Sequence, residues 1–229
     1  MSQNEIITRA HLKTPKAAAI AGILFSVLMG VIFWLLRMSV PANPLEAGAW
    51  LTANSRPVAL ALNLVPFAGV CFLWFIGVLR DRLGAREDRF FATVFFGSAL
   101  LFLAMLFAAS AVMGAILLAA AAEPNEMLNS ATLHFARALA YNIANIYAIK
   151  MAGVFMFSTS TVAVYTGFAP RWIAILGYLL ALTLLLGSYY ITWGFAVLPL
   201  WVLLISIHIL VDNFRRPGEL VTQKAPGGE

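Results

Sequence analysis

The sequence predicts an all-α protein: a polytopic integral membrane bundle of six transmembrane helices, with helices three and four extended on the extracytoplasmic side. Two observations lead to this fold class. The 229 residues are 62% hydrophobic and 11% charged, with a mean hydropathy of +0.89. Soluble domains are about half apolar and a quarter charged. Most apolar stretches also reach the length of about 20 residues that crosses a bilayer as a helix, so lipid is expected to cover most of the apolar surface.

The first predicted span covers residues 16–36. Its apolar run, residues 17–36, follows Arg9, Lys13 and Lys16, as the core of a signal peptide would follow basic residues, but the run is longer than such a core and long enough to cross a bilayer. Small side chains recur in it at every fourth position and predict close packing of another helix on this face, within the chain or in a self-dimer. These small residues are Ala18, Gly22, Ser26 and Gly30.

The second predicted span covers residues 57–79. Pro57 suits the first turn of a helix, where its missing N–H is no loss. Pro66 lies inside the span and removes one backbone hydrogen bond, which predicts a kink. Residues 80–89 then mix four arginines with three carboxylates, a pattern typical of a solvated loop with internal ion pairs. Contact with anionic headgroups or a cytoplasmic partner is the alternative.

The third and fourth spans, residues 90–122 and 131–168, are too long for one crossing each. At 1.5 Å per residue the third would be roughly 50 Å long, against about 30 Å of hydrocarbon. The acidic turn at Glu123 and Glu126 joins the two segments. We therefore expect a pair of helices that projects roughly 15–20 Å beyond the outer leaflet, with apolar faces that call for a partner.

The fifth and sixth spans cover residues 172–190 and 195–211. The fifth carries small residues on one face, which again predicts close helix packing. In the sixth, His208 and Asp212 lie one helical turn apart and form a candidate pair at the inner membrane interface.

The distribution of basic residues predicts the orientation. With six spans both termini lie on the same side, together with most of the lysines and arginines, and the positive-inside rule places that side in the cytoplasm. The chain then divides into a cytoplasmic segment (1–15), a transmembrane domain (16–211) and a cytoplasmic tail (212–229). The predicted location is the bacterial cytoplasmic membrane, with both termini cytoplasmic. The predicted outer loops hold only Arg37, Arg56 and Arg137.

Lys150 is the most polar group within a predicted span. A lysine at the bilayer centre costs about 2.5–3.5 kcal/mol, and no carboxylate lies within any span to pair with it. Lys150 either reaches the outer interface with its charged end or faces a partner's carboxylate, an anionic lipid or a polar cluster with Asn142 and Asn145. The candidate residues for contact with a partner or lipid are Met113, Glu123, Glu126, Arg137, Tyr141, Asn142, Asn145 and Lys150.

Several function classes find no support in the sequence. It has no phosphate-binding glycine loop, no intramembrane acid of the kind used in proton relays, and three scattered histidines. One cysteine, Cys71, allows neither a disulfide framework nor a thiolate metal site within the chain. We therefore expect no enzyme activity, no catalytic residues, no cofactor, no metal and no nucleic-acid partner.

Two segments carry a resemblance to known sequences. Residues 75–91, with the run Leu79-Arg80-Asp81-Arg82-Leu83-Gly84, and residues 170–174 resemble stretches in an uncharacterised bacterial family of six-span membrane proteins. The size and layout of the chain also resemble an accessory subunit of an actinobacterial Mce-type lipid importer. This resemblance implies membrane lipids and other membrane subunits as partners.

The expected function is thus that of a non-catalytic membrane accessory subunit that docks onto a larger complex, and a lipid transport system is the complex that we expect. The alternative is a transporter or channel for a small solute or lipid, with a path near Lys150.

Overall fold

The computed structural model describes residues 3–41, 43, 48–83, 89–122, 130–167, 169–188 and 193–215. In these ranges the chain is helical and contains no strand. Five helices of the described chain are long and apolar enough to cross a membrane, and a sixth apolar helix is shorter, at 17 residues. The all-α prediction is confirmed to this extent.

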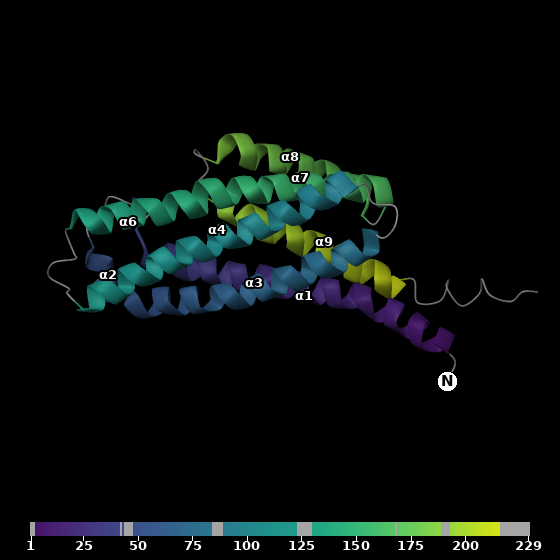
Figure 1. Ribbon diagram of the computed structural model, residues 1–229, viewed down its shortest axis with the longest axis horizontal. Helices are drawn as coiled ribbons and strands as arrows, with labels where there is room; N and C mark the ends of the chain where they lie inside the picture. Colours follow the sequence, from purple (N-terminus) through teal and green to yellow (C-terminus); the bar gives the residue numbers. More distant parts are fainter. Residues whose placement is uncertain are drawn as a thin grey trace, which may run out of the picture.

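The helices lie along a common long axis, and the chain runs back and forth between the two ends of the bundle (Figure 1). The long third and fourth apolar stretches of the sequence become α4 and the nearly continuous series α6, η2 and α7. The elements are α1 (Gln3–Ser39), α2 (Ala49–Ala53), α3 (Ser55–Leu83), α4 (Arg89–Ala122), α6 (Ala131–Asn142), the π-helix η2 (Ile143–Ala148), α7 (Ile149–Thr166), α8 (Arg171–Gly187), the 3₁₀ turn η3 (Gly194–Ala196) and α9 (Val197–Arg215).

The main core is built on aromatic rings from four helices. The ring of Phe72 in α3 lies with its centroid 4.7 Å from that of Phe25 in α1, 5.5 Å from that of Phe102 in α4 and 5.2 Å from that of Phe155 in α7. All four side chains are buried. Ring pairs of this kind stabilise a core beyond their buried area, so they fix the mutual positions of α1, α3, α4 and α7.

The small-residue stripe of α1 packs within the chain. A Cβ placed on Gly22 would meet Ser206 of α9 and the Phe75 ring of α3. One turn further along α1, Ser26 donates a hydrogen bond of 2.8 Å to the carbonyl of Pro199 in α9. The stripe therefore lets α1 approach both α3 and α9 closely, as expected for small residues between membrane helices. Gly30 differs, since it is exposed and has no neighbouring atom around its Cβ position.

The peripheral helix α8 rests on α7 (Figure 1). A Cβ on Gly177 would meet Ser160 of α7 and the Trp201 ring of α9, so small size is required at this crossing. Tyr178 adds a hydrogen bond of 2.8 Å from its hydroxyl to Thr161 Oγ1. Within α7, the hydroxyl of Thr161 and those of its neighbours Ser158 and Thr159 donate to backbone carbonyls one turn earlier, so these groups serve helix packing.

The end of the bundle that holds α2 has a second, smaller core. Trp50 and Leu51 of α2 pack there with Val58 of α3, Ile116 of α4 and Leu133 of α6. In Figure 1, α3, α4 and α6 reach further toward this end than α8 and α9 do. The paired ends of α4 and α6 are thus not free-standing, because α2 and the start of α3 cover part of their apolar surface.

Other apolar side chains at this end remain uncovered. Leu118 is 76% exposed and Phe135 is 70% exposed. The turn between α4 and α6, with Glu123 and Glu126, lies outside the described residues.

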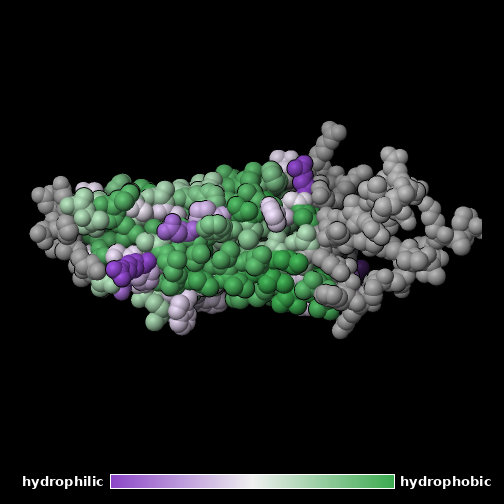
Figure 2. Space-filling view, turned by 90° about the horizontal axis from the view of Figure 1, so that it is seen from below, coloured by the Kyte–Doolittle hydropathy of each residue, from purple (hydrophilic) through white to green (hydrophobic). Residues whose placement is uncertain are grey.

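The outer surface of the bundle is strongly apolar. Figure 2 shows one face on which hydrophobic side chains dominate along the middle of the molecule, with few hydrophilic groups. Large side chains such as Trp74, Leu186 and Leu200 are exposed on three different helices. Because a soluble monomer rarely exposes so large an apolar area, the bundle has the character of a multi-pass membrane protein.

Candidate functional site: a cavity with an arginine at one end

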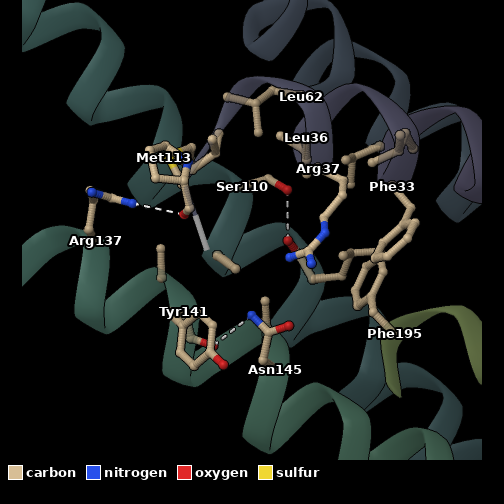
Figure 3. Close-up of a pocket in the computed structure, with 18 residues that line it drawn as sticks. Phe33, Leu36, Arg37, Leu62, Ser110, Met113, Arg137, Tyr141, Asn145 and Phe195 are labelled. Carbon is tan, nitrogen blue, oxygen red and sulfur yellow. Dashed lines mark hydrogen bonds between the residues drawn. The ribbon is translucent and has the colours of Figure 1, made fainter. Parts of the chain in front are cut away.

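A cavity of about 200 Å³ lies between α1, α3, α4, α6, η2 and η3 (Figure 3). It exceeds the roughly 150 Å³ of a dry cavity that admits benzene, but it is smaller than the 300–1,000 Å³ typical of sites that enclose a whole drug-sized ligand. It therefore suits one end of a larger molecule. Its labelled lining residues are Phe33, Leu36, Arg37, Leu62, Ser110, Met113, Arg137, Tyr141, Asn145 and Phe195.

Arg37 supplies a positive charge that is free to meet a ligand. It lies in the last turn of α1 and its side chain is exposed. Figure 3 shows it pointing into the space bounded by Ser110, Phe33 and Phe195. Among the residues that the structure describes, no hydrogen bond or ion pair involves its guanidinium group. A guanidinium group presents five N–H donors in a planar fork that matches a carboxylate or phosphate.

Arg137, the second arginine of the cavity, is engaged by the protein itself. Its side chain is only 3% exposed. Nη2 donates hydrogen bonds of 3.1 Å to the carbonyl of Pro41 and 3.0 Å to that of Asn43. The guanidinium also lies over the ring of Trp50, with Cζ 5.3 Å from the ring centroid. Arg137 was a candidate for contact with a partner, but its buried position makes it an anchor for the chain that follows α1.

The remaining polar groups of the cavity come from α4, α6 and η2. Asn145 donates a hydrogen bond of 3.2 Å to the carbonyl of Tyr141, one turn earlier. Ser110 donates one of 2.8 Å to the carbonyl of Leu106. These bonds engage the hydroxyl of Ser110 and one N–H of the Asn145 amide within their own helices. The cavity wall is otherwise mostly apolar, and its polar side chains are those of Arg37, Ser110, Arg137, Tyr141 and Asn145.

The π-helix η2 contributes Ala144 and Asn145 to the wall. Such i→i+5 segments are rare and occur frequently at functional sites. The apolar periodicity of the sequence gives no sign of it, because the pattern reads as one long helix through residues 131–168.

Of the eight residues predicted for partner or lipid contact, the cavity brings together Met113, Arg137, Tyr141 and Asn145. Asn142 is exposed, and its amide donates a hydrogen bond of 2.9 Å to the carbonyl of Ala138.

The other predicted site residues lie elsewhere. Lys150 is half-buried in the first turn of α7 and lines neither this cavity nor the one described next. Glu123 and Glu126 fall outside the described residues. His208 is half-buried and Asp212 exposed near the end of α9, and their proposed pairing stays a prediction.

A second cavity, of about 110 Å³, adjoins the first. Phe33 and Phe195 line both, and their rings stack with centroids 6.4 Å apart. It runs between α1 and α9, and its wall is apolar apart from the hydroxyl of Ser26. That hydroxyl is engaged with the carbonyls of Gly22 and Pro199.

The fold and these cavities define a class: a helical bundle with a membrane-like exterior and an amphipathic cavity toward one end. Comparisons with protein-family models, with characterised proteins and with solved structures found no match. Within the described ranges, no three His, Cys, Asp or Glu side chains come together as a metal site would require.

Proposed function

We propose that this chain is a non-catalytic accessory subunit of a larger membrane complex that handles lipids. The observation that carries the proposal is the cavity of about 200 Å³, which combines an apolar wall with the guanidinium of Arg37. An apolar space that contains an exposed guanidinium matches an amphipathic anion, which is the chemistry of a lipid. Ligand sites of this type are mostly apolar, with a few polar groups that fix orientation.

The proposal includes a topology of six spans with both termini in the cytoplasm. In it α8 is the fifth crossing and brings the number of spans to six, which its 17 residues allow, since about 17–25 residues cross the hydrocarbon core. The cavity then lies toward the extracytoplasmic face, because Arg37 ends the first span. The ends of α4 and α6 extend beyond the outer leaflet together with α2.

The docking surface in this proposal is the uncovered part of those ends. Leu118 of α4 and Phe135 of α6 are exposed there, and the acidic turn with Glu123 and Glu126 follows Leu118 in the chain. Large apolar side chains outside the bilayer favour contact with another protein. The resemblance to accessory subunits of Mce-type lipid importers agrees with such a role.

Purification of the tagged native protein in mild detergent, with mass spectrometry of co-purifying proteins and lipids, tests the proposal. We expect stoichiometric membrane partners, and their loss from a Leu118→Ser, Phe135→Ser double variant. Leu186→Ser is the matched control, because Leu186 is equally exposed but lies on α8. Purification of the parent protein without any protein partner would refute the accessory role.

A transporter or channel with a path near Lys150 is the second candidate. It is favoured by the π-helix η2, which interrupts the regular helix directly before the turn that carries Lys150. Solute flux into proteoliposomes that is lost in Lys150→Ala and kept in Arg56→Ala would support this alternative over the first.

A further inference from the structure

We infer that the two adjoining cavities form one elongated site for a long-chain fatty acid, with its carboxylate on Arg37 and its chain passing Phe33 and Phe195 into the α1–α9 cavity. The inference rests on the proposed lipid-handling function for the choice of a lipid as ligand. It adds the class of lipid, its direction in the site and the residue that binds its charge.

The shared wall of the two cavities is the first observation. Phe33 and Phe195 belong to the walls of both cavities, so the two spaces are neighbours with this pair of rings between them. Both rings are only half-buried, and they are the two lining residues that the cavities have in common. An alkyl chain that crosses between them would therefore contact aromatic faces throughout.

The length of the site fits one acyl chain. Arg37 and Ser26, the two α1 residues between which the ligand would lie, are eleven residues apart, a rise of about 16 Å in a helix. The hydrocarbon core of a bilayer is about 30 Å thick, so each leaflet's chains span about half of that. A short acid would leave the α1–α9 cavity empty.

The width of the site selects a single chain. The two cavities hold about 200 Å³ and 110 Å³, and together they reach only the lower limit of the roughly 300–1,000 Å³ found for sites that enclose a whole drug-sized ligand. At Gly30, in the wall of the second cavity, no atom lies within 4 Å of the Cβ position. The groove is thus open at Gly30, where a larger side chain would fill it.

The distribution of charge along the site gives the direction in which the fatty acid would lie. Arg37 stands at one end without a protein partner among the described residues, whereas the hydroxyl of Ser26 at the other end is bonded to backbone carbonyls. One guanidinium can bind one carboxylate through two parallel hydrogen bonds. The second arginine, Arg137, is buried and donates hydrogen bonds to Pro41 and Asn43, so Arg37 is the exposed guanidinium to which we assign the carboxylate.

Titration of the purified full-length chain in mild detergent, followed by native mass spectrometry, tests the inference. The probes are hexadecanoic acid, hexadecanol, hexadecyl phosphate and octanoic acid. The acid should bind about 10–100-fold more tightly than the alcohol, since a hydrogen bond to a charged group contributes about 1.5–3 kcal/mol. Equal binding of acid and alcohol would overturn the charge assignment, and tighter binding of hexadecyl phosphate would replace the carboxylate by a phosphate.

Two substitutions locate the ligand. Arg37→Ala should weaken hexadecanoic acid binding by about 10–100-fold, Arg37→Lys should restore part of it, and Arg56→Ala should leave it unchanged. Gly30→Leu should weaken binding of hexadecanoic acid but not of octanoic acid. Gly77→Leu is its control, because Gly77 is also exposed with open space around its Cβ position. Parent-like binding in Arg37→Ala or in Gly30→Leu would refute the assigned site.

The comparison of acid with alcohol uses the parent protein, so it decides the charge assignment even where a variant does not fold. The titration also uses the isolated chain. Loss of protein partners would therefore refute the accessory role without affecting the lipid site, and loss of fatty-acid binding would refute the site without affecting the accessory role.

Discussion

The guanidinium of Arg137 lies over the indole of Trp50, with Cζ 5.3 Å from the ring centroid, and so joins α6 to α2. The same group donates hydrogen bonds to the carbonyls of Pro41 and Asn43. One side chain thus holds the segment between α1 and α3 against α6. It also closes one side of the cavity, since both Pro41 and Arg137 belong to its wall.

Arg137→Met should destabilise the protein by about 2–4 kcal/mol, because it removes hydrogen bonds from a charged donor and a cation–π contact while keeping the apolar stem. Thermal unfolding in detergent measures the effect. Arg56→Met is the matched control, since Arg56 is exposed at the start of α3 and should tolerate the change. An equal effect of the two substitutions would contradict the anchoring role of Arg137.

Gly22→Ala and Gly30→Ala should change the free energy of unfolding in opposite directions, although both residues belong to the same stripe of small residues on α1. The added methyl at Gly22 meets Ser206 and Phe75, which should cost about 1–3 kcal/mol of unfolding free energy. At Gly30 it meets nothing, and the greater helix propensity of alanine should leave the protein unchanged or more stable by up to about 1 kcal/mol. Chemical denaturation in detergent distinguishes the two, and a neutral Gly22→Ala would disprove the close α1–α9 approach.

Tyr178→Phe should lower the free energy of unfolding by about 0.6 kcal/mol, the typical contribution of a hydrogen bond between membrane helices. It removes the bond to Thr161 that ties α8 to α7. Tyr147→Phe, at an exposed position, should have no effect. A double-mutant cycle with Thr161→Val gives the coupling directly, and a coupling of zero would show that the bond does not hold α8 in place.

Labelling of single cysteines with a membrane-impermeant maleimide should reveal the topology. In a Cys71→Ala background, Arg56→Cys and Trp193→Cys should react in intact cells, and Arg171→Cys only after permeabilisation. Arg171 and Trp193 flank α8 and both are exposed. Reaction of both from the same side would mean that α8 does not cross the membrane, and the six-span topology would be wrong.

The sequence predicts the helices well because their length and apolar character are local properties. The predicted third span, residues 90–122, agrees with α4 at Arg89–Ala122, and the predicted first and second spans lie within α1 and α3. The interior packing of Gly22 and Ser26 also follows from their spacing. The kink at Pro66 stays a prediction, since α3 continues as a helix through this residue.

The cavity could be predicted only in part, because it depends on how distant helices meet. Polarity within an apolar segment pointed to Tyr141 and Asn145, and these do line it. The same criterion favoured Lys150, but Lys150 does not line the cavity. Arg37 was missed as a site residue, because an arginine at the end of a span is ordinarily an interfacial anchor and nothing in the sequence brings it beside Phe195.

The π-helix Ile143–Ala148 separates two faces of what is otherwise one long helix. Residues before it, such as Arg137 and Tyr141, face the cavity, while Phe155 after it faces the aromatic core. A residue in a π-helix turns the chain through a smaller angle than a residue in an α-helix, so a π segment absorbs about one extra residue. Winding the same residues as a regular α-helix would rotate α7 relative to α6 by up to about 100° about their shared axis. Phe155 would then leave its place against Phe72, whereas deletion of one residue together with the π-helix would keep both faces in position.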